Sequence, residues 1–137
     1  MAEQLPPNFD WVTRRAQCSA VQMFEVLRTA AKENVDQRNR TLGHETGDAK
    51  ALYGFNDGAE RSFTVFATYG RKRRAVDFYL SNDGVLRIEP FAGAGVELGL
   101  TLTDDAVCRL TIGAEILDPW QVLRRVLEPL LFEDYKG

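Results

Sequence analysis

The sequence predicts an α+β domain, in which an antiparallel sheet of six or seven strands forms a meander and an N-terminal and a C-terminal helix cover one of its faces. Three observations predict this class. Seven short segments alternate apolar and polar residues, which is the period of a strand with one buried face. Two longer segments repeat apolar residues at helical spacing. Short, turn-forming connections separate most of the alternating segments, which makes successive strands antiparallel neighbours.

The N-terminal part is expected to contain one strand and one helix. Residues 11–17 alternate and predict a short strand. Ser19 begins the helix, because Gln22 three residues later completes a capping box. The helix is expected to end near Asn39, before a glycine-containing loop over residues 40–48. Its apolar residues recur on one side: Ala20, Met23, Phe24, Leu27, Ala31 and Val35.

The middle of the chain is predicted to be the strand meander. Two Asn-Asp-Gly sequences, at residues 56–58 and 82–84, predict hairpin turns, because Asp and Gly tolerate the positive φ that such turns require. Asp104 and Asp105 predict a further turn. The strands themselves are expected at residues 49–55, 62–69, 74–80, 85–89, 96–103 and 106–112.

The last predicted element is a short amphipathic helix. Asp118 is a favourable N-cap, Pro119 suits the first helical position, and Gln121 stands at the capping-box position. Pro129 lacks a backbone N–H, so we expect a kink or a break there. The apolar face comprises Val122, Leu123, Val126, Leu127 and Leu130.

Composition limits the classes of function. The chain has 137 residues, so we expect a loose lead-in over residues 1–10 and one domain over residues 11–137. A net charge of −3 gives no general attraction to nucleic acid, and no such partner is expected. No apolar stretch approaches the ~20 residues that span a bilayer. Without an export signal at its start, the protein is expected to be cytoplasmic.

The two cysteines, Cys18 and Cys108, belong to no CxxC pair and are interpreted as reduced core thiols. An alternative reading makes Cys18 a nucleophile, because a helix N-terminus lowers a thiol pKa when the thiol is exposed. That reading needs a base, and His44 is the single histidine of the chain. The core interpretation is preferred.

Other polar clusters do not make a catalytic constellation. His44, Glu45 and Asp48 are residue types that bind metals, but their spacing matches no metal motif, so they are interpreted as a polar surface loop. Residues 93–95 resemble part of a phosphate loop, but a strand follows them where such loops lead into a helix. We therefore expect no catalytic residue, no metal and no cofactor, and enzyme activity is not favoured.

One candidate interaction surface combines charge and aromatic side chains. Four consecutive cations, Arg71, Lys72, Arg73 and Arg74, are expected at a hairpin tip, where they either contact an acidic partner or keep a sheet edge hydrated. The second interpretation is preferred. Two aromatic residues on the strands, Phe66 and Tyr79, are expected to point away from the main apolar face.

The segment Arg15–Leu27 is similar to the opening of the helix-grip (START-like, or polyketide-cyclase-like) superfamily, where a short strand runs into a helix with an aromatic-x-x-Leu pair, here Phe24 and Leu27. The order of the expected elements resembles the same superfamily. The resemblance implies an apolar cavity between a curved sheet and the terminal helix, and no functional residue is carried over from it. The candidate lining of that cavity is Tyr53, Phe63, Phe78, Leu98, Leu100, Leu123 and Leu127.

Two functions follow as expectations. The first is non-enzymatic binding of a small apolar or amphipathic ligand between helix and sheet. Its basis is a sheet with one apolar, aromatic-rich face and a sequence without a recognisable set of catalytic residues. The second is a small acidic protein-interaction module of the immunity or secretion-chaperone type, which would pair with a protein partner or form a homodimer.

Overall fold

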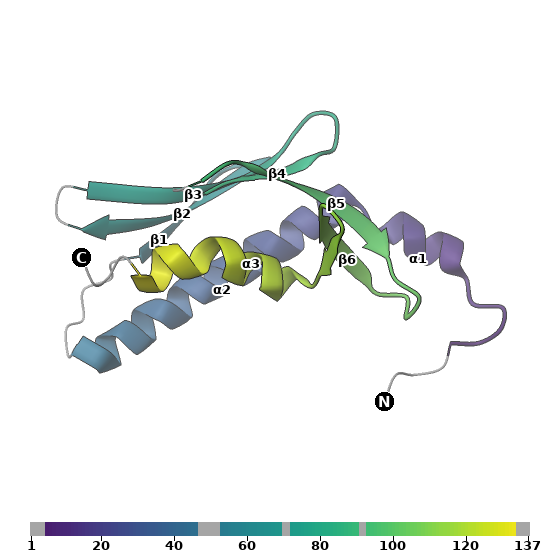
Figure 1. The fold of residues 1–137 in the computed structure, drawn as a ribbon, viewed down its shortest axis with the longest axis horizontal. Coiled ribbons are helices and arrows are strands. Elements are labelled where there is room, and N and C mark those ends of the chain that lie inside the picture. Colours follow the sequence, from purple (N-terminus) through teal and green to yellow (C-terminus); the bar gives the residue numbers. More distant parts are fainter. Residues whose placement is uncertain (1–4, 47–52, 70–71, 91–92, 134–137) are drawn as a thin grey trace.

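The computed structural model describes residues 5–46, 53–69, 72–90 and 93–133. Two helices precede a seven-stranded sheet and a third helix follows it, which confirms the predicted α+β class (Figure 1). The helices are α1 (Trp11–Gln17), α2 (Ala20–Thr46) and α3 (Pro119–Glu128), and the π-helical turn η1 (Pro129–Glu133) continues α3. The strands are β1 (Tyr53–Ala59), β2 (Ser62–Tyr69), β3 (Lys72–Leu80), β4 (Leu86–Glu89), β5 (Val96–Leu102), β6 (Cys108–Ile112) and β7 (Glu115–Leu117).

The seven strands form one antiparallel sheet whose spatial order follows the chain from β1 to β7, as the predicted meander requires. The register places buried residues of neighbouring strands opposite each other. Phe63 pairs with Phe78, and Leu86 pairs with both Leu80 and Leu98. Their polar neighbours along each strand point to the opposite face, so one face of the sheet is apolar.

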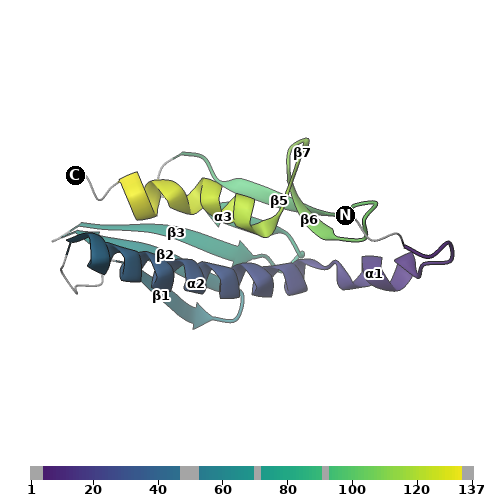
Figure 2. The same cartoon turned by 90° about the horizontal axis from the view of Figure 1, so that it is seen from below.

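Helices α2 and α3 cover that apolar face together (Figures 1 and 2). Helix α2 packs on β1, β2, β3 and α3, whereas α3 also contacts β6. The ring of Phe63 lies at the centre of this core, 4.4 Å from the ring of Phe78 and 5.2 Å from that of Phe24. A sheet with one apolar face needs such a cover, and the two helices supply it. Among the described residues, no helix is both long and apolar enough to cross a membrane.

Residues 11–17 form helix α1, so the predicted strand at this position is wrong. The side chain of Asp10 accepts hydrogen bonds from the backbone N–H of Thr13 at 3.1 Å and from its hydroxyl at 2.7 Å, which caps the helix. No residue of α1 is buried. Alternation over only seven residues does not distinguish a strand from a short helix. A strand also needs a neighbouring strand to pair with, and α1 lies outside the sheet, beyond the N-terminal end of α2 (Figure 2).

Helix α2 begins where the capping pattern places it, since the Ser19 hydroxyl accepts the backbone N–H of Gln22 at 3.2 Å. It ends at Thr46, so the expected loop is helical over residues 40–46. Arg38 and Leu42 continue the buried face of the helix past Asn39. Packing of this last part outweighs the low helix propensity of its glycine.

The first hairpin turns later than predicted. Residues 56–58 belong to β1, where the register shifts between Asn56 and Ala59, and the chain turns at residues 60–61. Arg28 of α2 explains this shift: its guanidinium pairs with the Asp57 carboxylate and donates to the carbonyl oxygen of Ala59 at 3.2 Å. A tertiary contact thus converts the expected turn sequence into a bulge.

The later turns match their sequence signals. Gly84, with φ 81°, lies in the predicted turn between β3 and β4. The chain turns again at Asp104 and Asp105, as predicted. The seventh strand of the sheet is not the expected segment 11–17 but β7, which follows a turn at Gly113, where φ is 58°. At three residues, β7 is too short for alternation to be recognised in the sequence.

Helix α3 has both predicted ends. The backbone N–H of Asp118 donates to the side-chain oxygen of Gln121 at 2.7 Å, and Pro119 occupies the first turn. At Pro129 the α-helix stops and the wider turn η1 begins, which confirms the predicted interruption. The guanidinium of Arg109 in β6 pairs with the Asp118 carboxylate at 2.9 Å and so ties the start of α3 to the sheet.

Candidate functional site

Among the described residues, an open groove lies between α2 and α3, called here the α2–α3 groove, with a volume of about 360 Å³. Each helix contributes residues three, four and seven positions apart, the spacing that places side chains on one side of a helix. Helix α2 contributes Asn34, Gln37, Arg38 and Thr41. Helix α3 and η1 contribute Trp120, Leu123, Arg124, Leu127, Glu128, Leu131 and Phe132.

The floor of the α2–α3 groove is apolar and belongs to the core. Leu123, Leu127 and Leu131 are at most 5% exposed, so they present a fixed surface. Trp120 and Phe132 stand at its two ends and are 60% and 50% exposed. Large exposed aromatic side chains beside a fixed apolar floor are typical of a binding surface.

Arg38 organises one end of the groove. This side chain is only 6% exposed, and its Nε donates to the backbone oxygen of Leu131 at 2.8 Å. Its Nη1 donates to the Thr41 hydroxyl at 3.2 Å, and its guanidinium stacks on the Phe132 ring at 4.1 Å. Arg38 therefore joins α2 to η1 and holds Phe132 at the rim.

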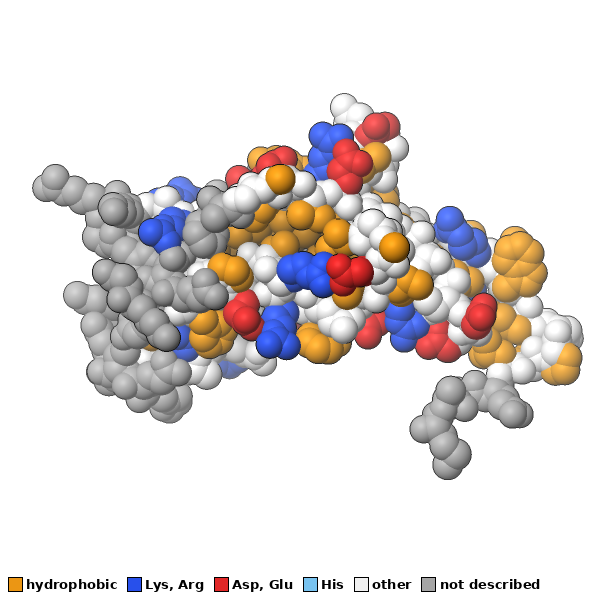
Figure 3. Space-filling view, in the orientation of Figure 1, with side chains coloured by type: hydrophobic (Ala, Val, Ile, Leu, Met, Phe, Trp, Pro, Cys, Tyr) orange, Lys and Arg blue, Asp and Glu red, His pale blue; other side chains and the backbone are white. Residues whose placement is uncertain are grey.

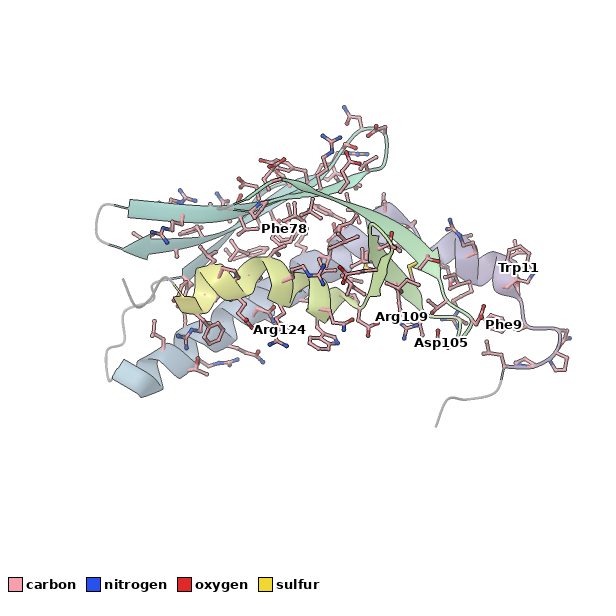
Figure 4. All side chains as sticks on the ribbon, viewed as in Figure 1. Phe9, Trp11, Phe78, Asp105, Arg109 and Arg124 are labelled. Carbon is pink, nitrogen blue, oxygen red and sulfur yellow. A yellow bond between two sulfur atoms is a disulfide. The ribbon has the colours of Figure 1, made fainter. Side chains whose placement is uncertain are left out.

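Arg124 supplies an accessible cation at the rim. Its Nε pairs with the Glu128 carboxylate at 2.9 Å, one turn along α3, and both side chains are well exposed. Figure 4 shows Phe78 on the sheet side of α3 and Arg124 on the side toward α2. Figure 3 shows hydrophobic side chains interspersed with basic and acidic ones around α3 on this face. An exposed ion pair is weak, so a ligand anion can compete with Glu128 for Arg124.

The predicted cavity residues lie mostly inside the packed core. Tyr53, Phe63, Phe78 and Leu98 are at most 6% exposed, and Leu100 packs against the same cluster. Only two of the seven, Leu123 and Leu127, line the α2–α3 groove. The groove thus lies between α2 and α3, and not between α3 and the sheet as the sequence suggested.

Of the predicted interaction residues, Phe66, Arg73 and Tyr79 lie on the uncovered face of the sheet, whereas Arg74 lies opposite the buried Ala67 on the covered face. Phe66 packs over its cross-strand neighbour Gly54, and the Arg73 guanidinium covers its ring at 4.2 Å. Tyr79 is 40% exposed, and burial, followed by the charges of Asp77 and Glu89, raises its pKa.

The cationic run is not confined to a hairpin tip, because residues 72–74 belong to β3. Arg74 is half-buried. Arg71 and the side chain of Lys72 lie outside the described residues.

The interpretation of Cys18 and Cys108 as reduced thiols is wrong: the two form a disulfide. Both are buried or half-buried, so their assignment to the interior was correct. The disulfide also removes the alternative of a Cys18 nucleophile, because neither sulfur is a thiol. The spacing of the two cysteines along the chain held no sign of this pairing.

The polar cluster of His44, Glu45 and Asp48 cannot be placed, since these side chains lie outside the described residues. Within the described residues, no group of three or more His, Cys, Asp and Glu side chains could hold a metal ion.

Among the groove residues that were not predicted from the sequence as site residues are Arg38, Trp120, Arg124 and Phe132. The helical spacing of residues 34, 37, 38 and 41 would have indicated the α2 side of the groove. It was not recognised because the helix was expected to end near Asn39, before residue 41. Phe132 follows Pro129, where the terminal helix was expected to be interrupted.

No protein-family model matches this chain, and neither a curated protein nor a solved structure matches it significantly.

Proposed function

We propose that this protein binds a small amphipathic molecule, without catalysis, in the α2–α3 groove. The observation that carries the proposal is the groove itself, with a volume of about 360 Å³, an apolar floor and a cation at the rim. Small-molecule sites are typically ~300–1,000 Å³, mostly apolar, with a few polar groups that fix orientation. The apolar body of the ligand lies on Leu123, Leu127 and Leu131, between Trp120 and Phe132.

This site replaces the helix–sheet space that was expected to hold the ligand. A ligand there would have to separate packed rings, such as those of Phe63 and Phe78 at 4.4 Å. Interiors packed at crystal-like density open only at a large cost in free energy. The α2–α3 groove is already open between its two helices, so a ligand enters it without separating these packed rings.

The charges of the groove favour an anionic head group. Two cations, Arg38 and Arg124, line it together with one carboxylate, Glu128. Arg38 is engaged with Leu131 and Thr41, so Arg124 is the cation that a head group reaches. A ligand carboxylate exchanges for Glu128 on the Arg124 guanidinium, which binds carboxylates through paired N–H groups. The ligand class is therefore an apolar chain or ring that carries a carboxylate.

Tryptophan fluorescence tests this proposal directly, because the chain has two tryptophans and only Trp120 lines the groove. In a Trp11→Phe variant, decanoate should change the emission of Trp120 saturably. 1-Decanol has the same apolar body without the charge and should bind more weakly. Lack of saturation with both ligands would remove the proposal.

Two further variants, made in the Trp11→Phe background, separate the apolar floor from the head group. Phe132→Ala should weaken both ligands at least about fivefold, from the loss of ~1 kcal/mol of apolar contact. Arg124→Ala should weaken decanoate and leave 1-decanol unchanged. Tyr79→Ala, on the uncovered face of the sheet, is the matched control and should change neither affinity.

The exposure of Trp120 and Phe132 favours a second candidate, the small acidic protein-interaction module, paired with a protein partner or with a second copy. Native mass spectra of freshly purified protein, compared with denaturing spectra, distinguish the two. A mass excess that is lost on denaturation supports the small ligand. A bare mass at twice the chain weight supports the module as a homodimer. The helix-grip resemblance remains a proposal and carries neither function.

A further inference from the structure

The disulfide joins two distant parts of the chain at one corner of the fold. Cys18 lies between α1 and α2, and Cys108 is the first residue of β6, 90 positions later. Their Cα atoms are 5.3 Å apart. Cys18 is 3% exposed, whereas Cys108 is half-buried. The yellow sulfur–sulfur bond in Figure 4 lies between the helical N-terminal region and the β5–β6 hairpin.

This corner lies at the border of the main core. Cys18 and Ala106 are buried outside the hydrophobic cluster that fills the space between helices and sheet, whereas Cys108 packs against that cluster. Helix α1 buries no residue. Helix α2 makes its main contacts with β1, β2, β3 and α3, far along the sheet from β6. From Met23 onward α2 is held by the main core, whereas the α1–α2 junction at Cys18 is joined covalently to the β5–β6 hairpin by the disulfide.

We propose that Cys18–Cys108 is formed in the working protein, where it acts as a redox-sensitive latch that holds α1 and the α1–α2 junction on the β5–β6 hairpin. A protein that depends on such a latch works in an oxidising compartment, because reducing compartments keep thiols reduced. This inference replaces the cytoplasmic location expected from the sequence, and it does not depend on the proposed ligand.

The chemistry of the latch is a thiol–disulfide exchange. On closing, the two cysteine thiols transfer two electrons to a disulfide oxidant and release two protons, and the oxidant leaves as two thiols. On opening, an external thiolate attacks Sγ of Cys108, the more exposed residue, and Cys18 leaves as the thiolate. A second external thiolate then releases Cys108 and completes the disulfide of the reductant.

The first test is the redox state at equilibrium. Reduced protein is incubated with a buffer of reduced and oxidised glutathione and then alkylated in denaturant. We expect one intramolecular disulfide, seen as protein without alkyl groups that gains two of them after full reduction. Protein that instead carries two alkyl groups, or two glutathione adducts, would overturn the proposal, because the pair would then have no tendency to close.

The second test is hydrogen exchange of the oxidised and reduced protein. On reduction, amides at the α1–α2 junction and in β6 should exchange at least about tenfold faster, while those of β1–β3 keep their rates. The double variant Cys18→Ser/Cys108→Ser should show the exchange rates of the reduced protein, and added reductant should not change them. Equal rates throughout both states would overturn the latch. A comparable acceleration in β1–β3 would also overturn it, because the disulfide would then hold the whole fold together.

The orientation of α1 gives an independent readout. Trp11 is 63% exposed on α1, and Trp120→Phe leaves it as the single tryptophan. Its fluorescence anisotropy should fall on reduction, because α1 is then released together with Cys18. An unchanged anisotropy would contradict the release of α1.

Discussion

The side-chain amide of Asn39 pairs with both backbone polar groups of Tyr53. Its Nδ2 donates to the Tyr53 carbonyl oxygen at 2.9 Å, and its Oδ1 accepts the Tyr53 N–H at 3.2 Å. Because β1 is an edge strand, one of its sides has no neighbouring strand. At Tyr53 the Asn39 amide supplies the donor and the acceptor that such a strand would provide. This contact fixes where the chain enters the sheet.

Asn39→Ala should therefore lower the free energy of unfolding by about 1–3 kcal/mol, since it leaves two buried backbone groups without their partner. Urea denaturation measures this change. Asn39→Asp keeps an acceptor for the Tyr53 N–H but loses the donor, and it should fall between the wild type and the alanine variant. Equal stability of all three proteins would show that water replaces the amide.

Gly54 and Phe66 are coupled across β1 and β2. A Cβ added at Gly54 would overlap the ring of Phe66, so the ring occupies the space above the glycine. Gly54→Ala should destabilise the protein by about 1–3 kcal/mol, because the ring must leave its position. In a Phe66→Ala background the same change should cost much less. A double-mutant cycle measures this coupling, and additive effects would contradict it.

Arg38 holds η1 against α2. Arg38→Ala should lower the unfolding free energy by about 1–3 kcal/mol, through the lost hydrogen bonds to Leu131 and Thr41 and the lost stacking on Phe132. Arg38→Lys should be about as unstable as the alanine variant. A lysine ammonium group is not planar, so it cannot stack on Phe132 or direct its N–H groups to Leu131 and Thr41 as the guanidinium does. Arg40→Ala, on the exposed side of α2, is the control and should be nearly neutral. Full rescue by lysine would show that charge alone matters.

Asp105 should titrate at unusually low pH. Its hydrogen bonds with Arg109 and then Thr103 lower its pKa from 3.8 to about 2. Because the pKa is lower in the folded protein than in the unfolded chain, the ionised carboxylate contributes stability above pH 3.8. That contribution is lost as the pH falls from 3.8 toward 2.

Carboxyl-carbon NMR of Asp105 measures this titration. Arg109→Gln should move the midpoint back toward 3.8, because it removes the largest cause of the shift. A midpoint that stays low in the variant would assign the shift to Thr103 instead.

Much of the fold could be predicted because its signals are local. The alternation of β2, β3 and β5, the caps at Ser19 and Asp118, and the interruption at Pro129 each depend on residues within a few positions of one another. The candidate site could be predicted only in part. Leu123 and Leu127 were recognised as apolar lining, but which space they line depends on how α3 sits against α2.

The sequence by itself determined an antiparallel meander with two covering helices, because periodicity and turn chemistry act over short distances along the chain. Only the tertiary structure decided that residues 11–17 are helical, that the first hairpin turns at residues 60–61 and not at residues 56–58, and that Cys18 meets Cys108. It also decided that Leu123 and Leu127 line a groove between α2 and α3. Each of these outcomes depends on partners far apart in the sequence, and short-range patterns carry no information about which distant residues meet.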